Sequence, residues 1–110
     1  EHFTGMSAGC RVICSSDDYT TGHLMNPTVP EKYRKIKIDK VVMEKFSCLG
    51  TNVVVMPGVI ISEGSVIGAN SLVTKTTEPW TIYVGSPAKP IKLRNSKLSY
   101  EFAKELGYDF

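Results

Sequence analysis

The chain has 110 residues, of which 42% are hydrophobic and 22% charged, with a formal net charge of +2. This composition is typical of one folded domain and argues against a disordered chain. So small a net charge gives no reason to expect nucleic-acid binding, and no stretch is long and apolar enough for a membrane helix. The three cysteines form no CxxC pair and are expected to be reduced, and a cytoplasmic location is the default expectation.

The N-terminal segment already shows a spacing of six residues. Met6 and Val12 lie six residues apart, and the small residues Cys10 and Ser16 follow each of them by four. This spacing predicts one turn of a repeating structure from the start of the chain to about Asp18. Because the pattern begins in mid-repeat and no Met precedes it, we expect the N-terminus to be incomplete.

Between Tyr19 and about Asp39 the spacing of six is lost. The stretch TTGHLMNPTVPEKYRK holds two prolines, several polar residues and a basic cluster. Such a stretch between two periodic segments predicts a loop that leaves the repeating scaffold. Loops held by a rigid scaffold often carry catalytic groups, so His23 is a candidate for chemistry.

Two linked series of residues follow, each with a period of six. One series is aliphatic, and the other, four positions later, is small or β-branched. The aliphatic series is Met43, Leu49, Val55, Ile61, Ile67 and Val73, and the second series is Ser47, Val53, Val59, Ser65, Ser71 and Thr77. Helices need a period near 3.6 and ordinary strands a period of 2, so neither explains the pattern.

A period of six fits short strands separated by turns. If each hexad forms one flat side, three hexads close a triangular coil, with aliphatic side chains pointing inward and layers about 4.8 Å apart. Small residues let the backbone turn at the corners, and the same turns are assigned to Gly50, Gly58, Gly64 and Gly68. The sequence therefore predicts an all-β fold, a parallel β-helix over residues 1–78 with the loop at about 19–39 extruded from it.

Pro79 ends the repeats, and residues 79–110 are predicted to form a C-terminal extension. Three apolar residues in it have helical spacing, namely Leu98, Phe102 and Leu106. We expect a short helix over 97–106, with Ser96 as a candidate cap and Gly107 as the stop.

The stretch CLGTNVVVMPGVIISEGSVIGANSLVTK, residues 48–75, resembles the hexapeptide-repeat acyltransferases, which are left-handed parallel β-helices. VGSPAKPIK, residues 84–92, is similar to the segment that closes the coil in that family, and DDYTTGHLMNP is similar to the segment of sugar O-acetyltransferases whose T-G-H carries the general base. The resemblance implies acetyl transfer from acetyl-CoA to a hydroxyl of a sugar or polysaccharide precursor, with no metal. It also implies a homotrimer with its sites between subunits.

The resemblance gives His23 the role of general base. A neutral imidazole can take the proton of an acceptor hydroxyl because its pKa lies near the operating pH. Asp17 and Asp18 are candidate substrate-binding residues, since a carboxylate accepts hydrogen bonds from sugar hydroxyls. The alternatives are a loop histidine without a task and a turn-forming pair of aspartates.

Four positions match the residues that line the pantetheine arm of CoA in the family, namely Thr51, Ala69, Thr74 and Lys75. Thr51 and Ala69 are 18 residues apart, so in a coil of three hexads they stack in neighbouring layers and leave a groove. A turn that tolerates small residues would also explain these two positions.

A basic cluster lies beyond the repeats, formed by Lys89, Lys92, Arg94 and Lys97. Such a cluster suits the phosphates of CoA, and the resemblance places Lys89 and Lys92 at the nucleotide end. A solvated basic face is the alternative.

The sequence departs from the sugar-acetyltransferase pattern where many relatives have V-W-I-G. Here Cys48 replaces the tryptophan, which leaves the identity of the acceptor open. The amino group of a nucleotide-linked amino sugar is a second candidate acceptor, and a non-catalytic trimeric β-helix is an alternative of another class. A γ-class carbonic anhydrase of this architecture would need three histidines for zinc, and the chain has two.

Overall fold

The structure is a computed structural model that describes residues 1–17, 24, 30, 32 and 36–109, with only the backbone at 15–17 and 36–38. Its strands are β1 (Gly5–Met6), β2 (Arg11–Val12), β3 (Ser15–Asp17), β4 (Ile36–Ile38), β5 (Val42–Met43), β6 (Cys48–Leu49), β7 (Val54–Val55), β8 (Ile60–Ile61), β9 (Val66–Ile67), β10 (Leu72–Val73), β11 (Thr81–Val84) and β12 (Lys89–Leu93). One helix, α1 (Ser96–Glu105), follows them.

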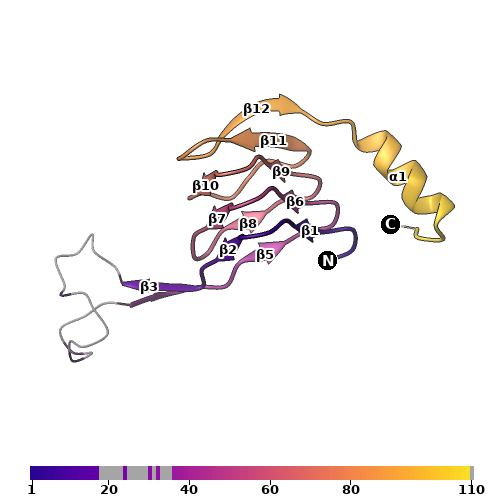
Figure 1. Cartoon of the computed structure of the whole chain (residues 1–110). Helices are drawn as coiled ribbons and strands as arrows, with labels where there is room; N and C mark the ends of the chain where they lie inside the picture. Colours follow the sequence, from indigo (N-terminus) through magenta and orange to yellow (C-terminus); the bar gives the residue numbers. More distant parts are fainter. Residues whose placement is uncertain (18–23, 25–29, 31, 33–35, 110) are drawn as a thin grey trace.

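The short strands stack in layers, as Figure 1 shows. The chain passes through three parallel stacks in turn, β1-β6-β9-β11, β2-β7-β10 and β5-β8, and β12 joins the first stack as an antiparallel edge strand. Cys48 pairs with Val66 and Val54 pairs with Leu72, each 18 residues further along the chain. The layered parallel strands expected from the period of six are therefore confirmed.

Both periodic series form the core. In the aliphatic series the residues from Leu49 to Val73 are at most 2% exposed, and in the second series all six residues are at most 4% exposed. The small residues were expected at the corners, but Ser47, Ser65, Ser71 and Thr77 are buried in the core. Their hydroxyls are satisfied locally: Ser65 Oγ donates to the Glu78 carbonyl at 2.7 Å, and Ser47 Oγ donates to the Glu44 carbonyl at 2.6 Å.

Two corners of the coil carry columns of residues with positive φ. One column, here called the small-residue corner, has Gly9, Asn52 and Asn70 at φ of 57–75°, preceded by Ala8, Thr51 and Ala69. The other, here called the aromatic corner, has Phe3, Phe46, Gly64 and Trp80 at φ of 53–70°. Gly58, at φ +80°, and Gly64 occupy turns as expected. Gly50 and Gly68 have another role, because a Cβ there would lie 2.8 Å from the Ala69 nitrogen and 2.7 Å from Val84 Cγ2.

The N-terminal layer and the β3–β4 pair lie at the lower end of the stack (Figure 1). The expected N-terminal layer is confirmed, because β1 and β2 pair in parallel with β6 and β7. Met6 and Val12 are 59% and 38% exposed because they belong to the outermost layer. The expectation of an irregular segment up to Asp39 was wrong at its end. Residues of β4 pair antiparallel with β3, and the two strands form a stem that projects from the stack (Figure 1).

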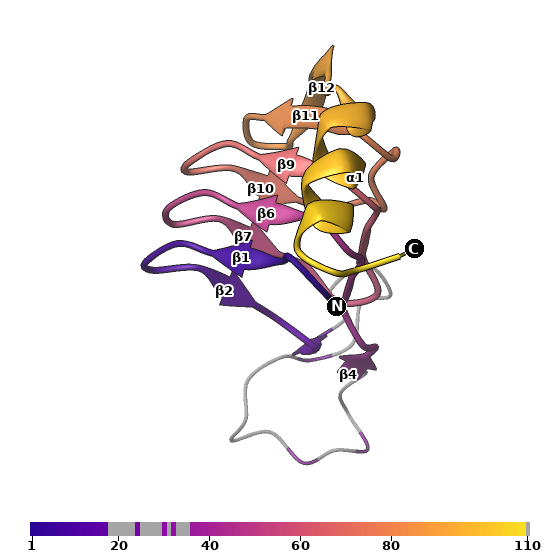
Figure 2. The ribbon, with the colours of Figure 1, turned by 90° about the vertical axis from the view of Figure 1, so that its right-hand side faces the viewer.

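The C-terminal segment runs back down the stack. After the β11–β12 hairpin, α1 descends beside the layers, as Figure 2 shows. The helix was expected and is confirmed, but its N-cap is Asn95 rather than Ser96, since the Asn95 side chain accepts from the Lys97 amide. Gly107, at φ +93°, follows the end of the helix.

Candidate functional site

The small-residue corner presents a column of short side chains. Thr51 and Ala69 are exposed and lie in neighbouring layers, because the Asn70 amide donates to the Thr51 carbonyl at 2.9 Å. One layer further, the Asn52 amide donates to the Ala8 carbonyl at 3.0 Å. Short side chains at this corner leave the backbone accessible from outside along the stack.

A pocket of about 310 Å³ lies where the repeats end. Its walls come from the residues after β10 and from the segment that leads into β12, and the Ala88 amide holds the two together by donating to the Leu72 carbonyl at 2.8 Å. The residues that line it are Val73, Thr74, Lys75, Thr76, Tyr83, Pro87, Ala88, Lys89 and Pro90. Three of the predicted CoA-binding residues, Thr74, Lys75 and Lys89, thus gather on one pocket.

The basic cluster predicted from sequence is divided in the structure. Lys92 is exposed on β12, where it pairs with Ile82, and it does not line the pocket. Arg94 is partly buried and turned toward the coil: its Nη1 donates to the carbonyls of Phe46 and Gly64 at 2.9 and 3.0 Å. These two bonds attach Arg94 to the coil, and Arg94 is not among the residues that line the pocket.

The predicted acceptor side of the site cannot be placed in the same way. His23 and Asp18 lie outside the described residues. Asp17 is described by its backbone alone, in β3 opposite Ile36. The roles of these three residues therefore stay predictions.

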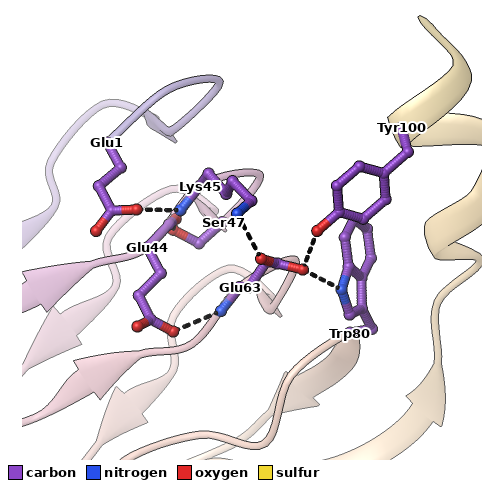
Figure 3. Close-up of polar contacts among 7 residues, drawn as sticks. All are labelled: Glu1, Glu44, Lys45, Ser47, Glu63, Trp80 and Tyr100. Atoms are coloured by element: carbon purple, nitrogen blue, oxygen red, sulfur yellow. Dashed lines mark hydrogen bonds and ion pairs between the residues drawn. The ribbon is translucent and has the colours of Figure 1, made fainter. Parts of the chain in front are cut away.

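Sequence reasoning missed a polar cluster at the aromatic corner, formed by Lys45, Glu63, Trp80 and Tyr100 and here called the Glu63 cluster (Figure 3). Glu63 accepts from Trp80 Nε1 at 2.9 Å and from the Tyr100 hydroxyl, and its Oε1 lies 3.0 Å from Lys45 Nζ. Glu44 Oε1 in turn accepts from the Glu63 amide at 3.0 Å. Glu63 and Lys45 are 18 residues apart, so the three-hexad spacing itself indicates that they lie in neighbouring layers. No such spacing relates Glu63 to Trp80 or to Tyr100.

The cluster changes the ionisation of its members. Partial burial acts to raise the pKa of Glu63, but the hydrogen bonds from Tyr100, Lys45 and Trp80 outweigh it and hold the pKa below the ordinary value. Burial and the hydrogen bond to Glu63 raise the pKa of Tyr100. The hydrogen bond to Glu63 raises the pKa of Lys45. At neutral pH the cluster is therefore an ionised carboxylate with three donors.

A second pocket, of about 220 Å³, lies between α1 and the coil. Its lining residues are Phe3, Phe46, Cys48, Arg94, Ser99, Phe102, Ala103 and Leu106. Cys48, which replaces the expected tryptophan, faces α1 there and is partly buried.

Within residues 1–17, 24, 30, 32 and 36–109, no three His, Cys, Asp or Glu side chains gather to hold a metal ion. Over the same residues, no helix is both apolar enough and long enough to cross a membrane.

No protein-family model matches the chain. Among curated proteins, it is 36% identical over 96 residues to the dTDP-4-amino-4,6-dideoxy-D-glucose acyltransferase of Escherichia coli, covering 87% of this chain and 50% of that protein. It is also 40% identical over 72 residues to the putative lipopolysaccharide biosynthesis O-acetyl transferase WbbJ of Escherichia coli K12, covering 66% of this chain and 37% of that protein.

Among solved structures, AntD, an N-acyltransferase from Bacillus cereus in complex with dTDP and 3-hydroxybutyryl-CoA, matches with a TM-score of 0.85. The match has 36% sequence identity and covers 96% of this chain and 58% of AntD. The chain belongs to the hexapeptide-repeat acyltransferase family. This family member spans about half the length, or less, of the curated relatives named here.

Proposed function

We propose that this chain is the acyl-CoA-binding part of an acyltransferase that moves an acetyl group from acetyl-CoA directly to a hydroxyl of a sugar or polysaccharide precursor. The observation that carries the proposal is the pocket on which Thr74, Lys75 and Lys89 gather. Two exposed lysines on one pocket offer two positive charges to an anionic ligand, and the phosphates of CoA are such a ligand.

The small-residue corner supports the other half of the cofactor site. The pantetheine arm is a thin chain with two amides, and it can lie flat only where side chains are short. Thr51 and Ala69 provide such a surface in two neighbouring layers. In the proposed site the arm follows this corner, Thr74 and Lys75 flank it, and Lys89 and Lys92 meet the nucleotide end.

The proposed chemistry uses His23 as general base. The neutral imidazole takes the proton of the acceptor hydroxyl while the oxygen attacks the thioester carbonyl. A backbone N–H would stabilise the oxyanion of the tetrahedral intermediate, and the imidazolium then returns the proton to the departing thiolate. Asp17 or Asp18 would accept hydrogen bonds from other hydroxyls of the acceptor.

An amino acceptor is the second candidate, and two of the three named relatives support it, whereas WbbJ is named as an O-acetyl transferase. The Escherichia coli acyltransferase is named for dTDP-4-amino-4,6-dideoxy-D-glucose, a dTDP-linked amino sugar. AntD is described as an N-acyltransferase with dTDP bound. A neutral amine needs less help from a base than a hydroxyl does. The dependence of the rate on His23 therefore separates the two acceptor types.

The proposed assembly is a homotrimer of left-handed coils. In it, the loop that carries His23 would meet the CoA groove of a neighbouring subunit, so each trimer would have three sites between subunits. The stem formed by β3 and β4 supports this arrangement, because it points away from its own stack (Figure 1).

The test is thiol release from acetyl-CoA and from a longer acyl-CoA, with a panel of sugars and nucleotide-linked amino sugars. The protein is compared with His23→Ala and with His2→Ala, the other histidine of the chain, as the matched control. We expect His23→Ala to lower kcat by about 10² to 10⁴-fold with a hydroxyl acceptor, and His2→Ala to leave it within about twofold.

The outcomes decide between the candidates. Activity with amino sugars that survives His23→Ala would favour the N-acyltransferase. A protein that binds no CoA and releases no thiol with any acceptor would be a non-catalytic β-helix module, and the proposal would fall.

A further inference from the structure

One wall of the CoA pocket belongs to an arm that is attached to the coil from outside. This arm consists of the segment from Pro87 through β12 to α1, and Lys89 stands at its start. β12 is the edge strand of its sheet, its residues are all exposed, and its pairing with β11 shifts register between Ile82 and Tyr83. An exposed edge strand with an irregular ladder needs further anchors to hold a fixed position.

One anchor lies beside Lys89, where the Ala88 amide donates to the Leu72 carbonyl. The other anchors lie at the far end of β12, about 16 Å along the strand from Lys89. There the Arg94 amide donates to the Trp80 carbonyl at 2.7 Å, and the Arg94 guanidinium bridges the carbonyls of Phe46 and Gly64. These acceptors belong to successive layers of the aromatic corner. The arm is thus fixed to the coil directly after β12 ends.

Glu63 joins three separate segments at this point (Figure 3). Lys45 belongs to the layer below, and Trp80 is the residue directly before β11. Tyr100 lies in the second turn of α1. The rings add to the junction, since the Trp80 and Tyr100 centroids are 5.7 Å apart and the Phe46 and Tyr100 centroids are 5.2 Å apart. Of these segments, only α1 belongs to the arm, and Tyr100 is its polar link to Glu63.

We propose that Glu63 is a positioning residue for the acyl-CoA site: by holding Tyr100 and Trp80 it fixes α1 and β12 on the coil and thereby keeps Lys89 on the pocket. The part that concerns CoA rests on the proposed function, whereas the attachment of the arm does not. Glu63 itself lies at the aromatic corner and is not among the residues that line the CoA pocket, so it acts through the arm.

The attachment of the arm by Glu63 is tested without any ligand. Trp80, the single tryptophan of the chain, donates to Glu63, so its fluorescence reports on the junction. We expect Glu63→Gln and Tyr100→Phe to raise acrylamide quenching of Trp80 and to speed amide hydrogen exchange in residues 85–105. Exchange in residues 48–55, which form β6 and β7, should stay as in the wild type. Glu78→Gln, an exposed carboxylate nearby, is the matched control and should change neither signal.

The effect of Glu63 on CoA binding is tested by steady-state kinetics of the same variants. A displaced Lys89 weakens binding of the nucleotide end, so we expect the KM for acetyl-CoA to rise about fivefold to tenfold, with kcat and the acceptor KM within about twofold. A lower stability with an unchanged KM for acetyl-CoA would show that Glu63 is merely structural and overturn the proposal. Unchanged exchange in residues 85–105 would overturn it as well.

The two proposals fail in different ways. If the wild type bound no CoA, the proposed function would fall and with it the CoA part of this inference. If the wild type turned over acetyl-CoA and Glu63→Gln had the same KM, only the positioning role would fall.

Discussion

The small-residue corner and the aromatic corner meet the same backbone requirement with opposite side chains. Both place a residue with positive φ in every layer, which allows the chain to turn between sheets. At the small-residue corner the turn is made by Gly9, Asn52 and Asn70 and stays exposed beside short neighbours. At the aromatic corner, Phe46 and Trp80 take the same conformation and are covered by α1.

The difference shows how one repeat can serve two purposes. Asn and Gly tolerate positive φ at little cost, so the small-residue corner needs no support from other elements and can remain open to a ligand. An aromatic residue at positive φ is strained, and the ring stacking and the Glu63 cluster offset that strain. One corner is therefore suited to binding, and the other to attaching the arm.

The largest effect is expected from Gly64→Ala at the aromatic corner. A Cβ there would lie 2.2 Å from the Trp80 ring, and Gly64 has φ +70°. We expect a loss of about 2 to 4 kcal/mol in the free energy of unfolding, measured by urea denaturation. Gly107→Ala, also at positive φ but with open space around it, should cost only about 1 kcal/mol. Equal losses in the two variants would refute the role given to Trp80.

The next effect concerns binding at the pocket that Lys75 and Lys89 line. Lys75→Ala and Lys89→Ala should each weaken CoA binding about tenfold, because each removes a charge-assisted contact to phosphate. Titration calorimetry at two salt concentrations measures this, and the loss should shrink at high salt. Lys40→Ala, which removes an exposed lysine elsewhere on the coil, should bind as the wild type does. A similar loss in Lys40→Ala would mean that only net charge matters.

A smaller effect is expected from Asn70 at the small-residue corner. Asn70→Ala should lower the free energy of unfolding by about 1 kcal/mol, because a φ of +59° is more strained for alanine than for asparagine. Asn70→Gly should stay within about 0.5 kcal/mol of the wild type. If Asn70→Gly is as unstable as Asn70→Ala, the side chain rather than the backbone conformation matters.

The smallest effect is a pH dependence of the aromatic corner. The folded-state pKa of Glu63 is lowered from its ordinary value of 4.5, so its contribution to stability is present above pH 4.5 and is lost as the pH falls through the lowered pKa. Unfolding curves of wild type and Glu63→Gln should therefore converge in acid. The other charged groups around the cluster, Glu44, Glu1 and Arg94, remain in both proteins. Parallel curves down to acid pH would contradict this assignment.

The sequence predicted the coil because its core is periodic. Ile61 and Ile67 occupy the same position in successive hexads and are both buried. The position of one core residue in such a series therefore predicts the position of the next. The stacking of Thr51 on Ala69 follows from the same arithmetic. Gly50 and Gly68 were expected in turns, but the structure requires them for the close approach of the next layer, which no spacing in the sequence indicates.

The arm and its attachment could not be predicted because they depend on contacts without a period. Glu63 and Tyr100 are 37 residues apart, and nothing in their spacing links them. Arg94 looked like one more base in a basic cluster, and only the structure shows its guanidinium turned to the carbonyls of the coil. The helix was predicted from its apolar spacing, but the face that it covers was not.

The central claim is that the small-residue corner carries acyl-CoA, and CoA binding to Ala69→Phe tests it most directly. We expect titration calorimetry to show that the wild type binds CoA. Ala69→Phe should bind at least about tenfold more weakly, because the ring would occupy the path of the pantetheine arm. Glu78→Phe, which adds the same ring at an exposed position near the aromatic corner, should bind like the wild type. Equal affinity of Ala69→Phe and the wild type would contradict the account.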